Sequence, residues 1–245
     1  MEIQKEAAEI VERFAAQELA VEPAHLSASE LAAIIDHTLL SPDATPNAFE
    51  NLCAEAREYG FASVCVQPYY VALCVRALEG TGIPVCSTVG FPLGSTLPAV
   101  KAYEARQALK KGAREIDMVM NVGLLKVGGY AAVVDDIAAV VEVAHGADAL
   151  CKVIIETALL TDEEKAAACL LIVEAGADYC KSSTGFAPGG ATVRDVALMR
   201  AAVGKRAGVK AAGGIHSYEE AMMMVGAGAT RIGASHGVEI VEGAP

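Results

Sequence analysis

Eight short apolar runs recur along the chain, and a stretch with helical spacing lies between each run and the next. Runs of this length, rich in Val, Ile and Ala and bounded by Gly or Pro, are typical of buried strands. Strands that alternate with helices form parallel sheets, and eight such units predict a (β/α)8 TIM barrel. The predicted strands cover residues 33–40, 61–66, 85–90, 115–123, 151–156, a short run from 179, 209–214 and 231–235.

The connections between the runs fit this fold. Thr161 and Glu164 have the spacing of a capping box at the start of one predicted helix. An open doubly wound sheet is the alternative fold, but no G-x-G-x-x-G fingerprint opens a helix here. Helices are predicted over residues 46–59, 69–79, 97–111, 129–144, 162–175, 192–203 and 217–226.

We expect one domain over residues 1–245, with residues 1–30 as an N-terminal helical extension. Residues 1–20 have the amphipathic pattern of a helix and lack the basic start and uninterrupted apolar core of a signal peptide. This helix is expected to pack either across a barrel end or at a subunit interface.

Charge and cysteine content narrow the function classes. The chain has 19 basic and 31 acidic residues, and its net charge of -12 argues against nucleic acid or an anionic membrane as a partner. Its 7 cysteines include no CxxC pair, which fits neither a disulfide framework nor a zinc site. The sequence therefore predicts a cytoplasmic protein without a metal centre.

Lysines stand out within the apolar strands. Lys181 begins the stretch KSSTG, and Lys152 and Lys210 occupy comparable positions in neighbouring strands. In the strand over 115–123, alternation separates Ile116, Met118 and Met120 from Asp117, which would point into the barrel lumen. All four polar side chains would then converge at one end of the barrel.

A cluster of lysines can make one amine nucleophilic. A lysine amine reacts only when neutral, and lowering its pKa from about 10.4 to about 7 requires roughly 4–5 kcal/mol. A second ammonium about 4 Å away supplies roughly 4 kcal/mol at an effective dielectric near 20. Either Lys181 or Lys210 could thus form a Schiff base, with the other as its neighbouring cation and Asp117 in the proton relay. A purely structural ion network is the alternative.

Small residues after the last two strands predict an anion site. Gly213 and Gly214 follow the seventh strand, and Gly233 and Ser235 lie in the eighth. Backbone N–H groups at this end of such barrels commonly bind phosphate. The alternative is that these glycines only form tight turns.

Eight motifs, in order, resemble one family of enzymes. The segments are IDHTLL, SVCV, VGFPLG, EIDMVMNVG, KVIIET, KSSTGFAPGGAT, KAAGGI and RIGAS. From about residue 30 onward, the sequence resembles the 2-deoxyribose-5-phosphate aldolases, class I aldolases with a barrel fold. The resemblance implies a lyase that reversibly joins acetaldehyde and glyceraldehyde 3-phosphate, without metal or organic cofactor. It also suggests a homodimer or homotetramer.

The resemblance assigns roles to the motif residues. Lys181 would form the Schiff base, Lys210 would favour its neutral amine and move protons, and Asp117 would act through water as acid and base. Lys152 would support the ion network. Cys65 either lines the pocket or is simply part of the core. The residues expected to contact substrate are Asp36, Thr38, Cys65, Lys152, Thr184, Gly185, Gly213, Gly214, Gly233 and Ser235.

The chain departs from this family at two histidines. His216 stands where many members have arginine, and His236 stands where a small residue is common, which puts phosphate affinity in question. His236 could cap the next helix, bond the phosphate, or be a surface residue. His37 is expected to be a packed polar residue. The competing functions are a lysine aldolase or transaldolase with a different donor, and a sugar-phosphate sensor without turnover.

Overall fold

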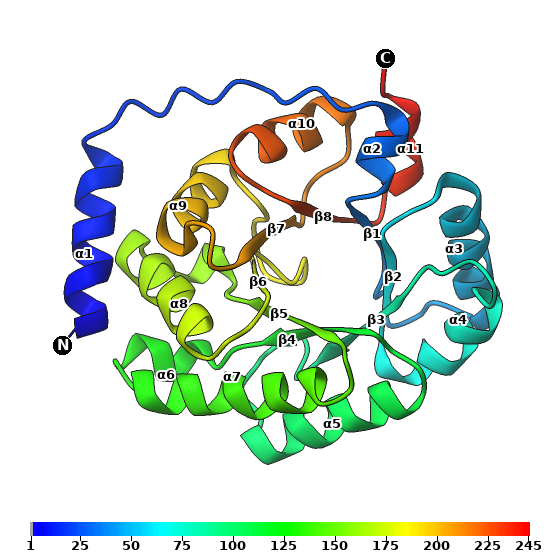
Figure 1. Cartoon of the computed structure of the whole chain (residues 1–245), viewed down its shortest axis with the longest axis horizontal. Coiled ribbons are helices and arrows are strands. Elements are labelled where there is room, and N and C mark those ends of the chain that lie inside the picture. The colour runs from blue at the N-terminus through cyan, green and yellow to red at the C-terminus, as the bar shows by residue number, and fades with distance from the viewer. Residues whose placement is uncertain (1) are drawn as a thin grey trace.

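The computed structural model describes residues 2–245 and consists of eight parallel strands that close into a barrel, with β1 paired to β8 (Figure 1). This is a (β/α)8 TIM barrel, as the sequence predicted. The strands are β1 (Ile35–Leu39), β2 (Ser63–Val66), β3 (Val85–Val89), β4 (Glu115–Val119), β5 (Leu150–Ile154), β6 (Tyr179–Lys181), β7 (Gly208–Ala212) and β8 (Arg231–Ala234).

Helices surround the barrel and cover the outer face of the sheet (Figure 1). Thr161 caps α8 through the predicted capping box with Glu164. The helices are α1 (Glu2–Ala15), α2 (Ala28–Ala32), α3 (Pro46–Tyr59), α4 (Val71–Ala77), α5 (Pro98–Lys110), α6 (Val122–Lys126), α7 (Tyr130–His145), α8 (Asp162–Glu174), α9 (Val193–Val203), α10 (Tyr218–Gly226) and α11 (Gly237–Glu242), with short 3-10 turns at Pro68–Tyr70 and Thr157–Leu159.

Several strands end earlier than the apolar pattern predicted. β4 stops at Val119 because Asn121 caps α6, its side chain accepting a hydrogen bond from the Leu124 N–H. β5 stops at Ile154, and Glu156 beyond it has a φ of 55°. β7 stops at Ala212, where the two following glycines adopt positive φ. The apolar pattern thus continues into the loops that build the site.

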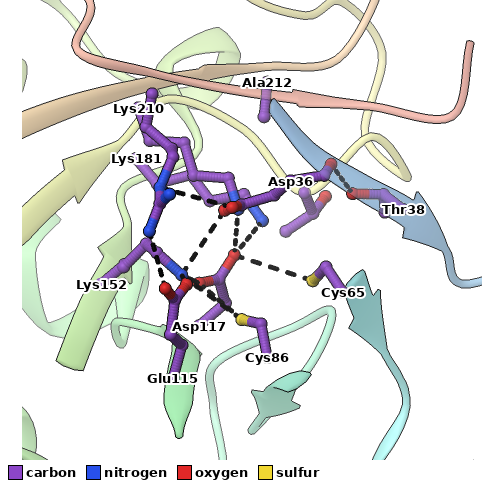
Figure 2. Close-up of polar contacts among 12 residues, drawn as sticks. Asp36, Thr38, Cys65, Cys86, Glu115, Asp117, Lys152, Lys181, Lys210 and Ala212 are labelled. Atoms are coloured by element: carbon purple, nitrogen blue, oxygen red, sulfur yellow. Dashed lines mark hydrogen bonds and ion pairs between the residues drawn. The ribbon is translucent and has the colours of Figure 1, made fainter. Parts of the chain in front are cut away.

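The two faces of the sheet have different contents. Ile116, Met118 and Met120 are fully buried in the apolar core between β4 and the helices. Asp117, between them in sequence, points into the lumen, where it contacts lysines from three other strands (Figure 2). The alternation predicted for this strand is therefore present.

The N-terminal extension packs on the outside of the barrel. Helix α1 lies against α8 and α9, and residues 16–27 run along the barrel to α2 (Figure 1). Ser27 caps α2 through a second capping box, with Glu30. None of the helices within residues 2–245 is both long and apolar enough to cross a membrane.

Candidate active site

Asp117 is the centre of a buried ion network in the lumen (Figure 2). Its Oδ1 accepts a hydrogen bond from Lys152 Nζ at 2.8 Å, and its Oδ2 accepts from Lys181 Nζ and Lys210 Nζ, both at 2.7 Å. Strand register brings these groups together, because Asp117 is the partner of Lys152 across β4 and β5, and Lys181 is the partner of Lys210 across β6 and β7.

A second set of charges completes this network. Asp36 accepts from Lys210 Nζ at 2.5 Å and from the Ser63 hydroxyl at 2.7 Å. Glu115 lies between Lys152 and Arg231, at 2.5 and 2.6 Å. Three carboxylates therefore oppose four cations. Sequence reasoning missed Glu115 and Arg231, although a charged residue at the start of an apolar strand was a visible signal.

The network fixes the charge of its members. Burial raises the pKa of Asp117, but the ammonium groups of Lys152, Lys181 and Lys210 outweigh it and hold that pKa well below its usual range. For Lys210, burial lowers the pKa, yet Asp117 and Asp36 together raise it above the ordinary lysine value. The pKa of Lys152 is raised in the same way, with Asp117 as the main opposing charge.

A cavity of about 340 Å³ opens above the network at the carboxyl ends of the strands. Of the three network lysines, only Lys181 lines it, and the Lys181 side chain is 4% exposed whereas those of Lys152 and Lys210 are 0% exposed. The amine of Lys181 thus joins the ion network to the space where a ligand fits.

The predicted substrate-contact residues divide into two groups. Asp36, Cys65 and Lys152 lie beneath the cavity, fully buried in or against the network, and do not line it. Cys65 faces Asp117 Oδ2 at 3.9 Å, beside Cys86, which is 3.1 Å from Asp117 Oδ1. The residues that do line the cavity are Thr38, Thr184, Gly185, Gly213, Gly214, Gly233 and Ser235.

The loop after β6 is shaped by a carboxylate. Glu156, two residues beyond the end of β5, lies in the left-handed region and accepts hydrogen bonds from the Thr184 N–H at 3.2 Å and from the Thr184 hydroxyl. The Thr184 hydroxyl oxygen accepts from the Phe186 N–H at 3.1 Å. These bonds turn the chain at Gly185, whose φ of 83° suits glycine.

Glycine is needed where the loops after β6 and β7 meet. A Cβ on Gly190 would lie 2.4 Å from the backbone oxygen of Gly213. Gly213 and Gly214 have φ values of 89° and 74°, which favour glycine. This close approach leaves a polar backbone surface on one wall of the cavity.

The three histidines of interest have distinct surroundings. His37 is buried, packs on Phe61, and has its Nε2 2.6 Å from Glu55 Oε2. His216 lines the cavity, and its Nδ1 is 3.1 Å from the Nδ1 of His236. His236 occupies the N-cap position of α11, but its side chain makes no capping hydrogen bond.

One buried cluster has the composition of a metal site. Cys65, Cys86 and Asp117 have ligand atoms within 4.8 Å of one another. Three ammonium groups bind the same carboxylate, however, so a divalent cation here would meet strong repulsion. The Asp117 carboxylate is thus placed to be held by lysines and not by a metal ion.

A family model and individual relatives match this chain over most of its length, and all of them are aldolases. The family model described as "DeoC/LacD family aldolase" matches residues 31–242. A protein of Streptococcus suis named deoxyribose-phosphate aldolase is 57% identical over 86% of this chain and 94% of its own length. Deoxyribose-phosphate aldolase 1 of Bacillus licheniformis is also 57% identical, over 87% of this chain and 96% of its own.

Solved structures with a similar fold include members of the same family. A putative deoxyribose-phosphate aldolase from Coccidioides immitis superposes with a TM-score of 0.88 at 43% identity, covering 98% of this chain and 96% of that one. A tetrameric deoxyribose phosphate aldolase from Aeropyrum pernix has a TM-score of 0.84 at 35% identity, covering 98% of this chain and 95% of that one.

Proposed function

The chain belongs to the DeoC/LacD family of aldolases, and on that premise we propose that it cleaves 2-deoxy-D-ribose 5-phosphate reversibly to acetaldehyde and D-glyceraldehyde 3-phosphate through a Schiff base on Lys181. The single observation that carries the assignment of Lys181 is its position. It is the one network lysine that lines the cavity, so its amine alone can meet a carbonyl there.

The charges of the network support a neutral Lys181. With all side chains ionised, four cations face the three carboxylates. If the Lys181 amine is neutral, three cations face three carboxylates and the buried charges balance. Lys152 and Lys210 keep their protons because their carboxylate partners raise their pKa. Lys181 is therefore the lysine whose neutral form balances the buried charges, which is the form that reacts with a carbonyl.

The chemistry then follows from the groups around this amine. Neutral Lys181 adds to the aldehyde carbon of the sugar, and loss of water gives an iminium ion. Removal of the proton of the C3 hydroxyl breaks the C2–C3 bond, and the two electrons flow into the iminium to give an enamine. Glyceraldehyde 3-phosphate departs. Protonation of the enamine and hydrolysis release acetaldehyde and restore the amine.

Asp117 and Lys210 are the acid and base groups within reach of Lys181. Asp117 Oδ2 contacts the side-chain nitrogens of both lysines, and we propose that it exchanges protons with the reacting centre through a water. Lys210 carries the positive charge that disfavours a second ammonium at Lys181. At the other end of the cavity, the backbone at Gly213 and Gly214, together with Gly233 and Ser235, is proposed to contact the phosphate.

Reductive trapping tests the proposal. The protein is incubated with acetaldehyde and borohydride, and the intact mass and peptide map are measured for the parent, Lys181→Leu and Lys152→Leu. We expect one ethyl group on the peptide containing Lys181 in the parent, retention of that site in Lys152→Leu, and no adduct in Lys181→Leu. An unmodified parent would refute an acetaldehyde donor. Trapping by a ketose instead would indicate another lysine aldolase, and ligand-induced stabilisation without trapping would indicate a sugar-phosphate sensor.

The cellular setting is part of the same proposal. We propose that the enzyme acts in deoxyribonucleoside catabolism in the cytoplasm, as a homodimer or homotetramer. The 7 cysteines are free and buried, which suits a reducing compartment. The Aeropyrum pernix protein is tetrameric, which supports an oligomer. Light scattering coupled to gel filtration gives the subunit number directly, and a monomer at working concentration would refute this part.

A further inference from the structure

Positive charge in the cavity comes from two side chains. Among the described residues that line it, only Lys181 and His216 can carry a positive charge. Lys181 is engaged with Asp117 at the base, whereas His216 lies on the loop after β7, beside Gly213 and Gly214. The charge available to an anionic group at this wall therefore depends on whether His216 is protonated.

His216 contacts a second histidine. Its Nδ1 lies 3.1 Å from the Nδ1 of His236, and the two rings meet edge to face with centroids 4.6 Å apart. A contact between two Nδ1 atoms requires one N–H donor and one lone pair. Two neutral rings satisfy this with two ring protons, and one added proton leaves the contact intact. A fourth proton would place two N–H groups face to face.

The added proton has a defined place. If His216 donates through Nδ1, its Nε2 carries a lone pair while both rings are neutral. After protonation, the same Nε2 is an N–H donor. The Ser235 hydroxyl also lies 3.1 Å from His236 Nδ1. The pair thus works as one unit that gains a single charge and a single donor.

Charged groups surround the pair. Glu219 and Glu220 lie in the first turn of α10, and the Glu220 carboxylate accepts a hydrogen bond from the backbone N–H of His216 at 2.7 Å. Helix α11 begins directly after His236, and Glu239 lies in its first turn. The amine of Lys181 lines the same cavity.

We propose that the His216–His236 pair makes recognition of the substrate phosphate depend on a proton: the protonated pair binds the phosphate, and phosphate binding draws a proton onto the pair. This inference rests on the proposed function for the identity of the ligand. An arginine in the same place would bind phosphate at every pH, whereas this pair binds it only while charged.

Steady-state kinetics with a matched variant test the proposal. KM for 2-deoxyribose 5-phosphate is measured from pH 6 to 8.5, with EDTA present, for the parent and His216→Arg. Ionisation of the substrate affects both proteins equally, so it cancels in the ratio of parent to variant KM. We expect this ratio to rise about fivefold with pH, the factor for one exposed ion pair. The same ratio for 2-deoxyribose, which has no phosphate, should stay constant.

The role of the partner ring has its own readout. In His236→Ala, the charged ring of His216 loses the nitrogen that accepts its Nδ1 proton. The midpoint of the rise in KM should therefore move to lower pH. A flat ratio for His216→Arg would overturn the proton-dependent recognition, and an unmoved midpoint in His236→Ala would overturn the pairing.

A binding experiment separates this proposal from the proposed function. Calorimetric titration with inorganic phosphate at pH 7, in two buffers of different ionisation enthalpy, gives the number of protons taken up. The parent should take up more than His216→Arg. That difference in a protein without aldolase activity would sustain the histidine pair while refuting the aldolase reaction. Equal uptake in an active enzyme would refute only the histidine pair.

Discussion

Lys181 and Lys210 donate to the same oxygen atom, Oδ2 of Asp117, each with its Nζ at 2.7 Å. The two nitrogens are therefore no farther apart than the sum of those distances. Two ammonium groups at about 5 Å repel by about 3 kcal/mol at an effective dielectric near 20. Lys210 also holds Asp36, so it keeps its place when Lys181 loses its proton.

Replacing the shared carboxylate should impair both chemistry and folding. In Asp117→Asn, three lysines lose their common counter-charge, and proton transfer at the reacting centre is lost. We expect kcat/KM for 2-deoxyribose 5-phosphate to fall by about 10²–10⁴-fold and the free energy of unfolding to fall by about 3–5 kcal/mol. Circular dichroism is the suitable probe of unfolding, because the chain has 0 tryptophans.

A second buried ion pair provides the control. Lys101 Nζ is 2.6 Å from Asp136 and 2.8 Å from the Val119 carbonyl oxygen, outside the lumen. Asp136→Asn should cost comparable stability but change kcat/KM of the folded protein by less than about twofold. Equal losses of activity in the two variants would show that Asp117 acts only through folding.

Gly233 gives the Lys210 side chain room to cross the barrel. A Cβ at this position would lie 2.8 Å from Lys210 Cε and 3.0 Å from the Ala212 Cβ. Gly233→Ala should displace the Lys210 ammonium from Asp36 and Asp117 and lower kcat by about 10²-fold. Gly123→Ala in α6 is the control for replacing a glycine by alanine. Its Cβ would meet nothing closer than 3.4 Å, so this variant should retain activity.

The sequence predicted which face of β4 carries the site, but not the height of each residue in the lumen. Alternation placed Asp117 inside, and the motif lysines followed. Height depends on the stagger between strands, which alternation does not contain. Cys65 illustrates this: the register that pairs it with Cys86 places it beside Asp117, below the cavity.

Contacts between residues far apart in the sequence could not be predicted either. Glu115 and Arg231 form an ion pair across the lumen although they lie 116 positions apart in the sequence. Glu55, on α3, is the partner of His37, and no motif links the two. The sequence gives the type of side chain on a face, whereas barrel closure decides which opposite strand it contacts.

The ion network should protect the fold over a wide pH range. Burial raises the pKa of Asp36 and Asp117, but lysines hold both below their ordinary values, so their contribution is complete above about pH 4 and is lost as the pH falls further. Lys152 and Lys210 have raised pKa values, so their contribution is complete below about pH 10.4 and is lost above it.

Melting curves from pH 2.5 to 9 test this. Tm should fall steeply only below about pH 4 in the parent. Asp36→Asn should show a lower Tm at neutral pH and a shallower acid slope, because one of the two depressed carboxyl groups is gone. Asp135→Asn, at an exposed position on α7, is the control and should follow the parent curve. An unchanged acid slope in Asp36→Asn would contradict the assignment.

Removing residues 1–17 should weaken the barrel without changing its chemistry. Ala7 and Ile10 are buried against the barrel, Phe14 packs on the same core, and Arg194 of α9 lies over the Phe14 ring at 5.4 Å. The family model begins at residue 31, and no described residue before Thr38 lines the cavity. Apolar burial by α1 is partly offset by the entropy of ordering it, so we expect a loss of about 1–3 kcal/mol in the free energy of unfolding.

Ile10→Ser should show part of this loss, and Glu9→Ser, on the exposed face, almost none. A folded truncated protein with altered KM would instead show that α1 reaches the active site.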